Sequence, residues 1–180
     1  MQKISLYDMD RTITVRGTYT PFLFHLLFAR APWRPHIESF ADKVLRSNRH
    51  QKAIDQVEAD RADGRTLVLV TASYELYAEA IARRLGFDHL IGTLLMVDGE
   101  GRVRPQIIGE NCYDDAKIGR IEDLFAQQGW QRAEAHVRAY SDHVSDQAML
   151  EFADEPIATT PTLPLRLLAE QRGWPIVDWR

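Results

Sequence analysis

The sequence predicts an α/β fold in which a parallel sheet is covered by helices on both faces. Short apolar runs alternate with longer amphipathic segments, which is typical of parallel strands connected by helices. Residues 3–7 and 66–70 (TLVLV) are predicted strands because each is too short and too apolar for a helix. Between them, residues 18–63 carry apolar side chains at helical spacing, interrupted by Pro32 and Pro35. We therefore expect a helical insertion after the first strand.

The remainder of the chain continues this alternation. Residues 74–85 have helical spacing and stop at Gly86, which suits a left-handed helix cap. Residues 90–109 predict a hairpin around a turn at residues 98–101. Further helices are expected at 115–128, 146–152 and 162–171, and further strands at 135–140, 156–159 and 175–177. The predicted division is a sheet domain at 1–14 and 65–180 and a small helical cap at 15–64.

Composition limits the partners that we expect. A chain of 180 residues is long enough to bury a core of its own, and 45% hydrophobic and 27% charged residues are ordinary for a globular protein. A net charge of -4 with scattered basic residues gives no general attraction to nucleic acid. The N-terminus lacks a secretory signal, and no apolar stretch approaches the roughly 20 residues that span a bilayer. The lone Cys112 fits a reducing compartment, so we expect a cytoplasmic protein without membrane or nucleic-acid partners.

Polar side chains follow three of the predicted strands. In open α/β sheets, ligands bind beyond the carboxyl ends of the strands, so these residues are the candidates for a site. They are Asp8, Asp10 and Thr12 after the first strand, Thr71, Ala72 and Ser73 after the second, and Asp142, His143 and Asp146 after the strand ending at Tyr140. Lys117 lies near the start of the helix before that last strand. If the strands are neighbours, the site suits both a cation and an anion.

The carboxylates themselves imply a metal ion. A carboxylate about 4 Å from one negative charge is repelled by about 4 kcal/mol at an effective dielectric of 20, and a phosphate dianion roughly doubles that. Mg²⁺ held by Asp8 and Asp142, with Lys117 on the opposite flank, would cancel the repulsion. Mg²⁺ prefers oxygen ligands, so this set is suitable. Asp146 is then expected to anchor a metal-bound water or to orient Lys117.

Residues 8–12 (DMDRT) resemble the DxDxT signature of the haloacid dehalogenase superfamily of phosphatases. Thr71 and Lys117 match the second and third motifs of that family, and residues 141–146 (SDHVSD) resemble its acidic fourth motif, GDGxND in phosphoserine phosphatases. All four motifs occur in the family's order. The position of the insertion is similar to subfamily IB, the phosphoserine phosphatase-like branch. The resemblance implies a Rossmann-like core with a small C1-type cap.

The resemblance also implies a mechanism and a set of roles. Asp8 attacks phosphorus, and Asp10 first protonates the leaving alcohol and then activates water to hydrolyse the aspartyl-phosphate. The catalytic residues implied are Asp8, Asp10, Thr71 and Lys117; the phosphate-binding residues are Thr12, Thr71, Ala72, Ser73, Lys117 and His143; and the Mg²⁺ ligands are Asp8, Asp10 through its carbonyl, Asp142 and Asp146. The implied activity is Mg²⁺-dependent hydrolysis of a small phosphorylated metabolite.

Several alternatives remain open at this point. Hydrolytic dehalogenation is one alternative, but that reaction does not require an acidic residue at Asp10. A phosphate-binding or regulatory module is another; it would bind phosphate at the same site without catalysing hydrolysis. Phosphoserine specificity is not favoured, because residues 16–18 (RGT) stand where that family places the acidic residue that reads the amine. Ser73 also suits the N-cap of the helix starting at Tyr74, and Arg11 is expected to face solvent. The short cap leaves open closure by a partner subunit in a homo-oligomer.

Overall fold

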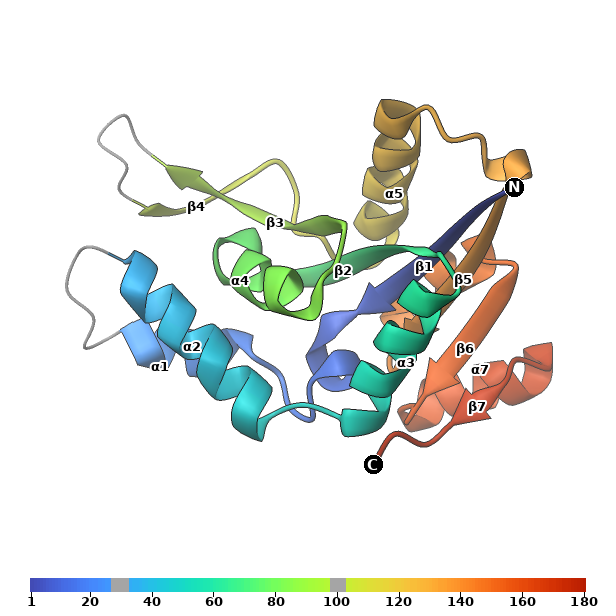
Figure 1. Cartoon of the computed structure of the whole chain (residues 1–180), viewed down its shortest axis with the longest axis horizontal. Helices are drawn as coiled ribbons and strands as arrows, with labels where there is room; N and C mark the ends of the chain where they lie inside the picture. Colours follow the sequence, from blue (N-terminus) through green and yellow to red (C-terminus); the bar gives the residue numbers. More distant parts are fainter. Residues whose placement is uncertain (27–32, 98–102) are drawn as a thin grey trace.

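A single mixed sheet organises the protein (Figure 1). The computed structural model describes residues 1–26, 33–97 and 103–180. Within these ranges the strands lie in the order β4-β3-β2-β1-β5-β6-β7, and every pairing is parallel except β3 with β4. They are β1 Gln2–Asp8, β2 Thr66–Tyr74, β3 His89–Val97, β4 Val103–Ile108, β5 Ala135–Ser141, β6 Glu155–Thr159 and β7 Ile176–Val177. The predicted α/β fold is confirmed.

Helices cover both faces of this sheet. They are α1 Tyr19–Leu26, α2 Arg34–Ser47, α3 Gln51–Ala62, α4 Glu75–Leu85, α5 Asp115–Gln128, α6 Gln147–Phe152 and α7 Leu163–Arg172. The predicted hairpin is present as β3 and β4, whereas its turn at 98–101, like Pro32, lies outside the described residues. No helix in the described ranges combines the length and the apolar character that crossing a bilayer requires.

Alternation along β1 divides the core into two apolar clusters, because successive side chains of a strand point to opposite faces. Ile4 and Leu6 pack in the cluster formed with α5, α6 and α7, whereas Tyr7 packs in the cluster formed with α1 to α4. All three side chains are fully buried. The sheet therefore lies between two helical layers, and its carboxyl edge remains available for a site.

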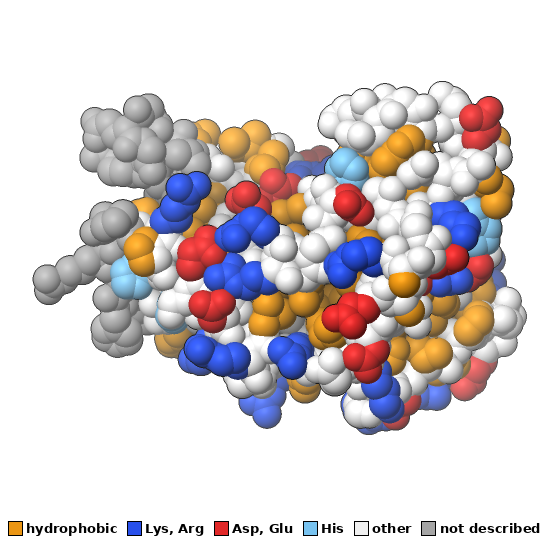
Figure 2. Space-filling view, in the orientation of Figure 1, with side chains coloured by type: hydrophobic (Ala, Val, Ile, Leu, Met, Phe, Trp, Pro, Cys, Tyr) orange, Lys and Arg blue, Asp and Glu red, His pale blue; other side chains and the backbone are white. Residues whose placement is uncertain are grey.

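The inserted helices α1 to α3 share the core of the sheet domain. Phe22 of α1 and Phe40 of α2 pack on Tyr77 of α4, with ring centroids 4.2 and 5.5 Å from that of the tyrosine. Burying an aromatic side chain of this kind contributes about 1.5–3 kcal/mol. Glu38 of α2 also forms ion pairs with Arg83 and Arg84 of α4, on a face where charges of both signs are mixed (Figure 2). Because solvent and salt screen exposed pairs, apolar packing supplies most of the attachment.

Asp60 of α3 ties the insertion to the centre of the sheet. Its side chain is 1% exposed and accepts hydrogen bonds from Ser5 Oγ at 2.6 Å and Tyr7 OH at 2.7 Å, both in β1. Arg138 and Tyr140 of β5 also contact it, at 2.6 and 3.2 Å. A buried carboxylate is tolerated only when it is paired and hydrogen-bonded, and Asp60 meets both conditions.

We predict that Asp60→Ala lowers the free energy of unfolding by about 3–5 kcal/mol, because it leaves a guanidinium and three hydroxyls without their shared acceptor. Urea unfolding measures the change. Asp63→Ala is the matched control, since Asp63 is an exposed carboxylate paired with Lys3, and its effect is expected to be much smaller. Equal effects of the two substitutions would contradict the role given to Asp60.

Candidate functional site

Parallel pairing brings the candidate residues to one edge of the sheet. Asp8 is the last residue of β1, and it stands in register with Val70 of β2. On the other side, Tyr7 stands in register with Tyr140 of β5. Thr71 and the residues after Tyr140 therefore continue past the same edge as Asp8, where ligands bind in open α/β sheets.

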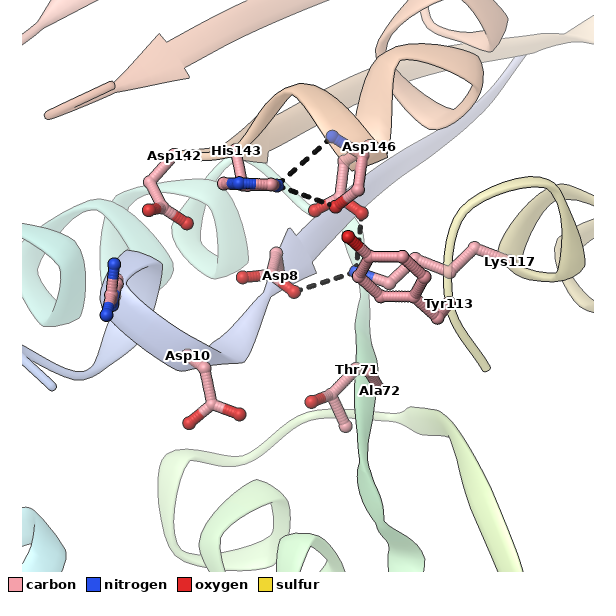
Figure 3. Close-up of a pocket in the computed structure, with 11 residues that line it drawn as sticks. Asp8, Asp10, Thr71, Ala72, Tyr113, Lys117, Asp142, His143 and Asp146 are labelled. Atoms are coloured by element: carbon pink, nitrogen blue, oxygen red, sulfur yellow. Dashed lines mark hydrogen bonds and ion pairs between the residues drawn. The ribbon is translucent and has the colours of Figure 1, made fainter. Parts of the chain in front are cut away.

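An open pocket of about 270 Å³ lies at this edge (Figure 3). It is lined by Asp8, Asp10, Arg11, Thr71, Ala72, Tyr113, Lys117, Asp142, His143, Ser145 and Asp146. In Figure 3, Asp8 lies between Asp142 on one side and Asp10 and Thr71 on the other. The structure thus brings most of the predicted site residues together from segments more than 100 positions apart in the sequence.

Two backbone irregularities determine the direction of these side chains. The turn at Met9–Ile13 after β1 places Arg11 at a φ of 66°, a left-handed conformation that is uncommon for residues other than glycine. The Thr14 amide closes this turn on the Met9 carbonyl at 3.0 Å. In β2 the register with β3 shifts between Val70 and Tyr74, an irregularity that redirects side chains next to a site.

A buried ammonium joins two of the carboxylates. Lys117 Nζ donates to Asp8 Oδ1 at 2.8 Å and lies 2.7 Å from Asp146 Oδ1, although the second contact is not aligned as a hydrogen bond. Ser141 Oγ donates to the other oxygen of Asp146 at 2.6 Å. Lys117 and Asp146 are each 2% exposed, so this chain of contacts fixes α5 against the ends of β1 and β5.

The carboxylates of the site carry more negative charge than the neighbouring cations balance. Burial raises the pKa of Asp8 above its ordinary value, against the opposing effect of Lys117. Burial likewise raises the pKa of Asp142 to about 6. Although burial alone would lower the pKa of Lys117, the charges of Asp8 and Asp146 raise it, so the ammonium is kept. Four aspartates line the pocket, against two Lys or Arg side chains, so the pocket favours an added cation.

The oxygens in the pocket fit Mg²⁺ in kind. Asp8 and Asp142 both line it, and carboxylate oxygens are the ligands that this ion prefers. Asp146 Oδ1 is buried and lies 2.7 Å from Lys117 Nζ, so Asp146 contacts the lysine that it is expected to orient. Among the described residues, however, no three His, Cys, Asp or Glu side chains already stand together as a metal-binding group.

Thr12 and Ser73 are not among the residues that line the pocket, unlike the other predicted phosphate contacts. Thr12 is fully buried, and its Oγ accepts a hydrogen bond from the Asp142 amide at 3.1 Å. Thr12 therefore helps to fix the position of Asp142, which lines the pocket. Ser73 is part of β2 and donates to Asp10 Oδ2 at 2.6 Å. The expected N-cap role of Ser73 is wrong, because α4 begins at Glu75 after Tyr74, which makes no side-chain cap bond.

The family model for haloacid dehalogenase-like hydrolases matches residues 24–151. The chain belongs to this family. A protein of Mycobacterium tuberculosis named as a probable phosphatase is 34% identical to this chain over 128 residues, which cover 71% of this chain and 43% of the relative. A phosphoserine phosphatase of the same organism is 35% identical over 145 residues, with coverage of 79% and 44%. The chain thus spans less than half the length of these relatives.

Solved structures show the same fold. A Bordetella pertussis protein of unknown function superposes on this chain with a TM-score of 0.86 at 23% identity, covering all of both chains. A phosphoserine phosphatase in its apo form superposes with a TM-score of 0.70 at 16% identity, covering 100% of this chain and 94% of the other. At these identities the likeness establishes the fold alone, and it agrees with the predicted haloacid dehalogenase-type core.

Three residues that line the pocket were not predicted as part of the site. Arg11 is exposed, as expected, but it also lines the pocket, and its charge opposes the raised pKa of Asp142. Tyr113 precedes α5 and is 48% exposed, and Ser145 bonds the ring of His143 at 2.9 Å. The sequence offers no motif for Tyr113, whose place depends on the backbone before α5, where Asp114 has a φ of 54°.

We predict that Lys117→Met destabilises the protein by about 3–5 kcal/mol at neutral pH, because two buried carboxylates lose the cation between them. Methionine retains most of the apolar stem, so the loss reports the charge. Unfolding is measured in the presence of a chelator, so that no metal replaces the ammonium. Lys3→Met, which removes an exposed ion pair with Asp63, is the control, and a Lys117→Met variant as stable as that control would refute the prediction.

Proposed function

We propose that this hydrolase is a Mg²⁺-dependent phosphomonoesterase that forms an aspartyl-phosphate on Asp8. The observation that carries the proposal is the placement of Asp8 at the end of β1, held by Lys117 through one oxygen, in a pocket that Asp10 and Thr71 also line. The relatives named as phosphatases support the same chemistry. A carboxylate fixed in this way is oriented for attack on a bound phosphoryl group.

In the first step, the Asp8 carboxylate forms a bond to phosphorus as the bond from phosphorus to the leaving oxygen breaks. Asp10 donates its proton to that leaving oxygen, which departs as an alcohol. Lys117 and Thr71 stabilise the negative charge on the phosphoryl oxygens, as do the backbone amides near Ala72. Mg²⁺, bound by Asp8, Asp142 and the Asp10 carbonyl, would neutralise the repulsion between the nucleophile and the phosphate.

In the second step, a water molecule attacks phosphorus and Asp10 accepts its proton. The bond between phosphorus and Asp8 breaks, which releases inorganic phosphate and restores the carboxylate. Asp10 thus serves first as an acid and then as a base, while Asp8 is the only residue that becomes covalently modified. Hydrolytic dehalogenation is not favoured, because it gives Asp10 no proton to transfer to a leaving group.

We propose that the substrate is a small phosphorylated metabolite. At residues 16–18 the chain lacks a carboxylate that would bind an amino group of the substrate. The backbone of Arg16 is bonded to Asn48, Gly17 has no side chain, and Thr18 is bonded to Asp10, so residues 16–18 offer no carboxylate to an amino group. This arrangement supports a substrate other than phosphoserine. Cys112 is buried and free, which is consistent with the cytoplasmic location that we also propose.

We predict that Asp8→Asn lowers the turnover of an aryl phosphate in Mg²⁺ at least about 10³-fold, because an amide is not a nucleophile in this reaction. The assay is release of inorganic phosphate across a panel of phosphomonoesters. Asp123→Asn, which changes an exposed aspartate of α5, is the matched control and is expected to retain activity. Binding of phosphate by the wild type without turnover of any ester would indicate a phosphate-binding module and contradict the proposal.

We also predict that chelation abolishes activity and that Mg²⁺ restores it. Asp142→Asn is expected to raise the Mg²⁺ concentration needed for half-maximal activity by at least about tenfold, because one anionic ligand is lost. Titration of activity against Mg²⁺ measures the shift for both proteins. An Asp142→Asn variant with an unchanged Mg²⁺ requirement would show that Asp142 does not hold the ion.

A further inference from the structure

Hydroxyl and amide donors bind both oxygens of the Asp10 carboxylate. Thr18 donates twice to Oδ1, from its amide and from its Oγ, each at 2.7 Å. Ser73 Oγ donates to Oδ2 at 2.6 Å. Thr18 directly precedes the inserted helix α1, whereas Ser73 belongs to β2 of the sheet domain. The carboxylate is therefore held jointly by the insertion and the sheet.

Tyr77 completes a ring of hydrogen bonds behind Asp10. Its hydroxyl donates to Ser73 Oγ at 2.6 Å and lies 3.0 Å from Thr18 Oγ. Tyr77 is fully buried, and burial raises the pKa of its phenol, so the hydroxyl stays protonated and remains a donor. Ser73 and Thr18 each use their one hydroxyl hydrogen on Asp10, and Tyr77 gives its own to Ser73, so the tyrosine orients Ser73 by donation and contacts Thr18 Oγ through its oxygen.

The ring of Tyr77 is itself fixed by the inserted helices. Its aromatic ring packs against Phe22 of α1 and Phe40 of α2, both of which are buried. Packing on two sides restricts the rotation of the tyrosine and so the direction of its hydroxyl. Tyr77 lies outside the pocket lining, so it acts on the pocket only through Ser73 and Thr18.

We propose that Tyr77, acting through Ser73 and Thr18, is a positioning residue that holds the Asp10 carboxylate in the orientation from which it protonates the leaving oxygen. This inference rests on the proposed function, because it assigns a support to the acid/base step of that reaction. It makes the packing of α1 and α2 on the sheet domain a determinant of proton transfer. The nucleophile is supported separately, by Lys117 from the other side of the pocket.

Leaving groups of different quality separate this role from a general loss of structure. An alkoxide is a poor leaving group and requires a proton as its bond to phosphorus breaks, whereas a nitrophenolate departs with little help. General acid catalysis typically contributes about 10²–10⁴-fold where the proton is needed. In kcat/KM, which reports the steps up to departure of the leaving group, a misplaced Asp10 therefore slows an alkyl phosphate much more than an aryl phosphate, whereas partial unfolding slows both equally. The later hydrolysis of the aspartyl-phosphate, in which Asp10 is the base, is common to both esters.

The test compares the wild type with Tyr77→Phe, which removes only the hydroxyl and keeps the ring between Phe22 and Phe40. We expect kcat/KM for ethyl phosphate to fall about 10- to 100-fold and kcat/KM for p-nitrophenyl phosphate to fall by less than about threefold. Ser73→Ala is expected to show the same selectivity, and Ser73→Thr to recover part of the loss. Tyr7→Phe, which deletes a buried hydroxyl bonded to Asp60, is the matched control and should leave the ratio of the two kcat/KM values unchanged.

Equal losses of kcat/KM for the two esters in Tyr77→Phe and Ser73→Ala, or no loss for either ester, would overturn the positioning role. Failure of the proposed function has a different result, since the wild type would then hydrolyse neither ester. In that event crystal structures of the wild type and Tyr77→Phe decide the matter. The proposal expects the Asp10 carboxylate to turn away from Ser73 and Thr18 in the variant, and an unchanged carboxylate would refute it.

Discussion

The buried contact of Lys117 with Asp8 and Asp146 is the interaction on which the site depends. An ammonium that is 2% exposed is tolerated only beside carboxylates that compensate the loss of its hydration. Its partners are the last residue of β1 and a residue of the turn after β5, while Lys117 itself is on α5. One ion-paired group therefore fixes three elements and places the nucleophile at the carboxyl edge of the sheet, where the strand order already favours ligand binding.

The side of the pocket that contains Asp10 is held by hydrogen bonds rather than by an ion pair. Asp10 is held by the hydroxyls of Thr18 and Ser73, with Tyr77 behind them, and within residues 1–26, 33–97 and 103–180 no Lys or Arg side chain bonds to it. The proposed nucleophile thus lies beside a fixed positive charge, whereas the proposed acid/base residue lies among uncharged groups. The two proposed roles therefore depend on different interactions, an ion pair for Asp8 and hydrogen bonds from uncharged groups for Asp10.

The sequence was most informative where the relevant interactions are local. The apolar runs gave β1 and β2, and the helix predicted at residues 74–85 is α4, which ends at Gly86 with a φ of 71°. The strand ends also identified most of the pocket lining, because parallel topology fixes where those ends meet. The role of Ser73 as a cap was wrong, since local propensity does not show that β2 continues through a bulge to Tyr74. The ring around Asp10 joins residues up to 67 positions apart, so neither it nor the place of Tyr113 could be predicted without the fold.

The measurement that tests the account most directly is rapid acid quenching of the wild type during turnover of a phosphate ester, followed by peptide mass analysis. The account predicts one phosphoryl group on the peptide that contains Asp8, and its absence from the Asp8→Asn variant. Turnover by the wild type without a phosphorylated enzyme at any quench time, or a phosphoryl group on a different residue, would contradict the account.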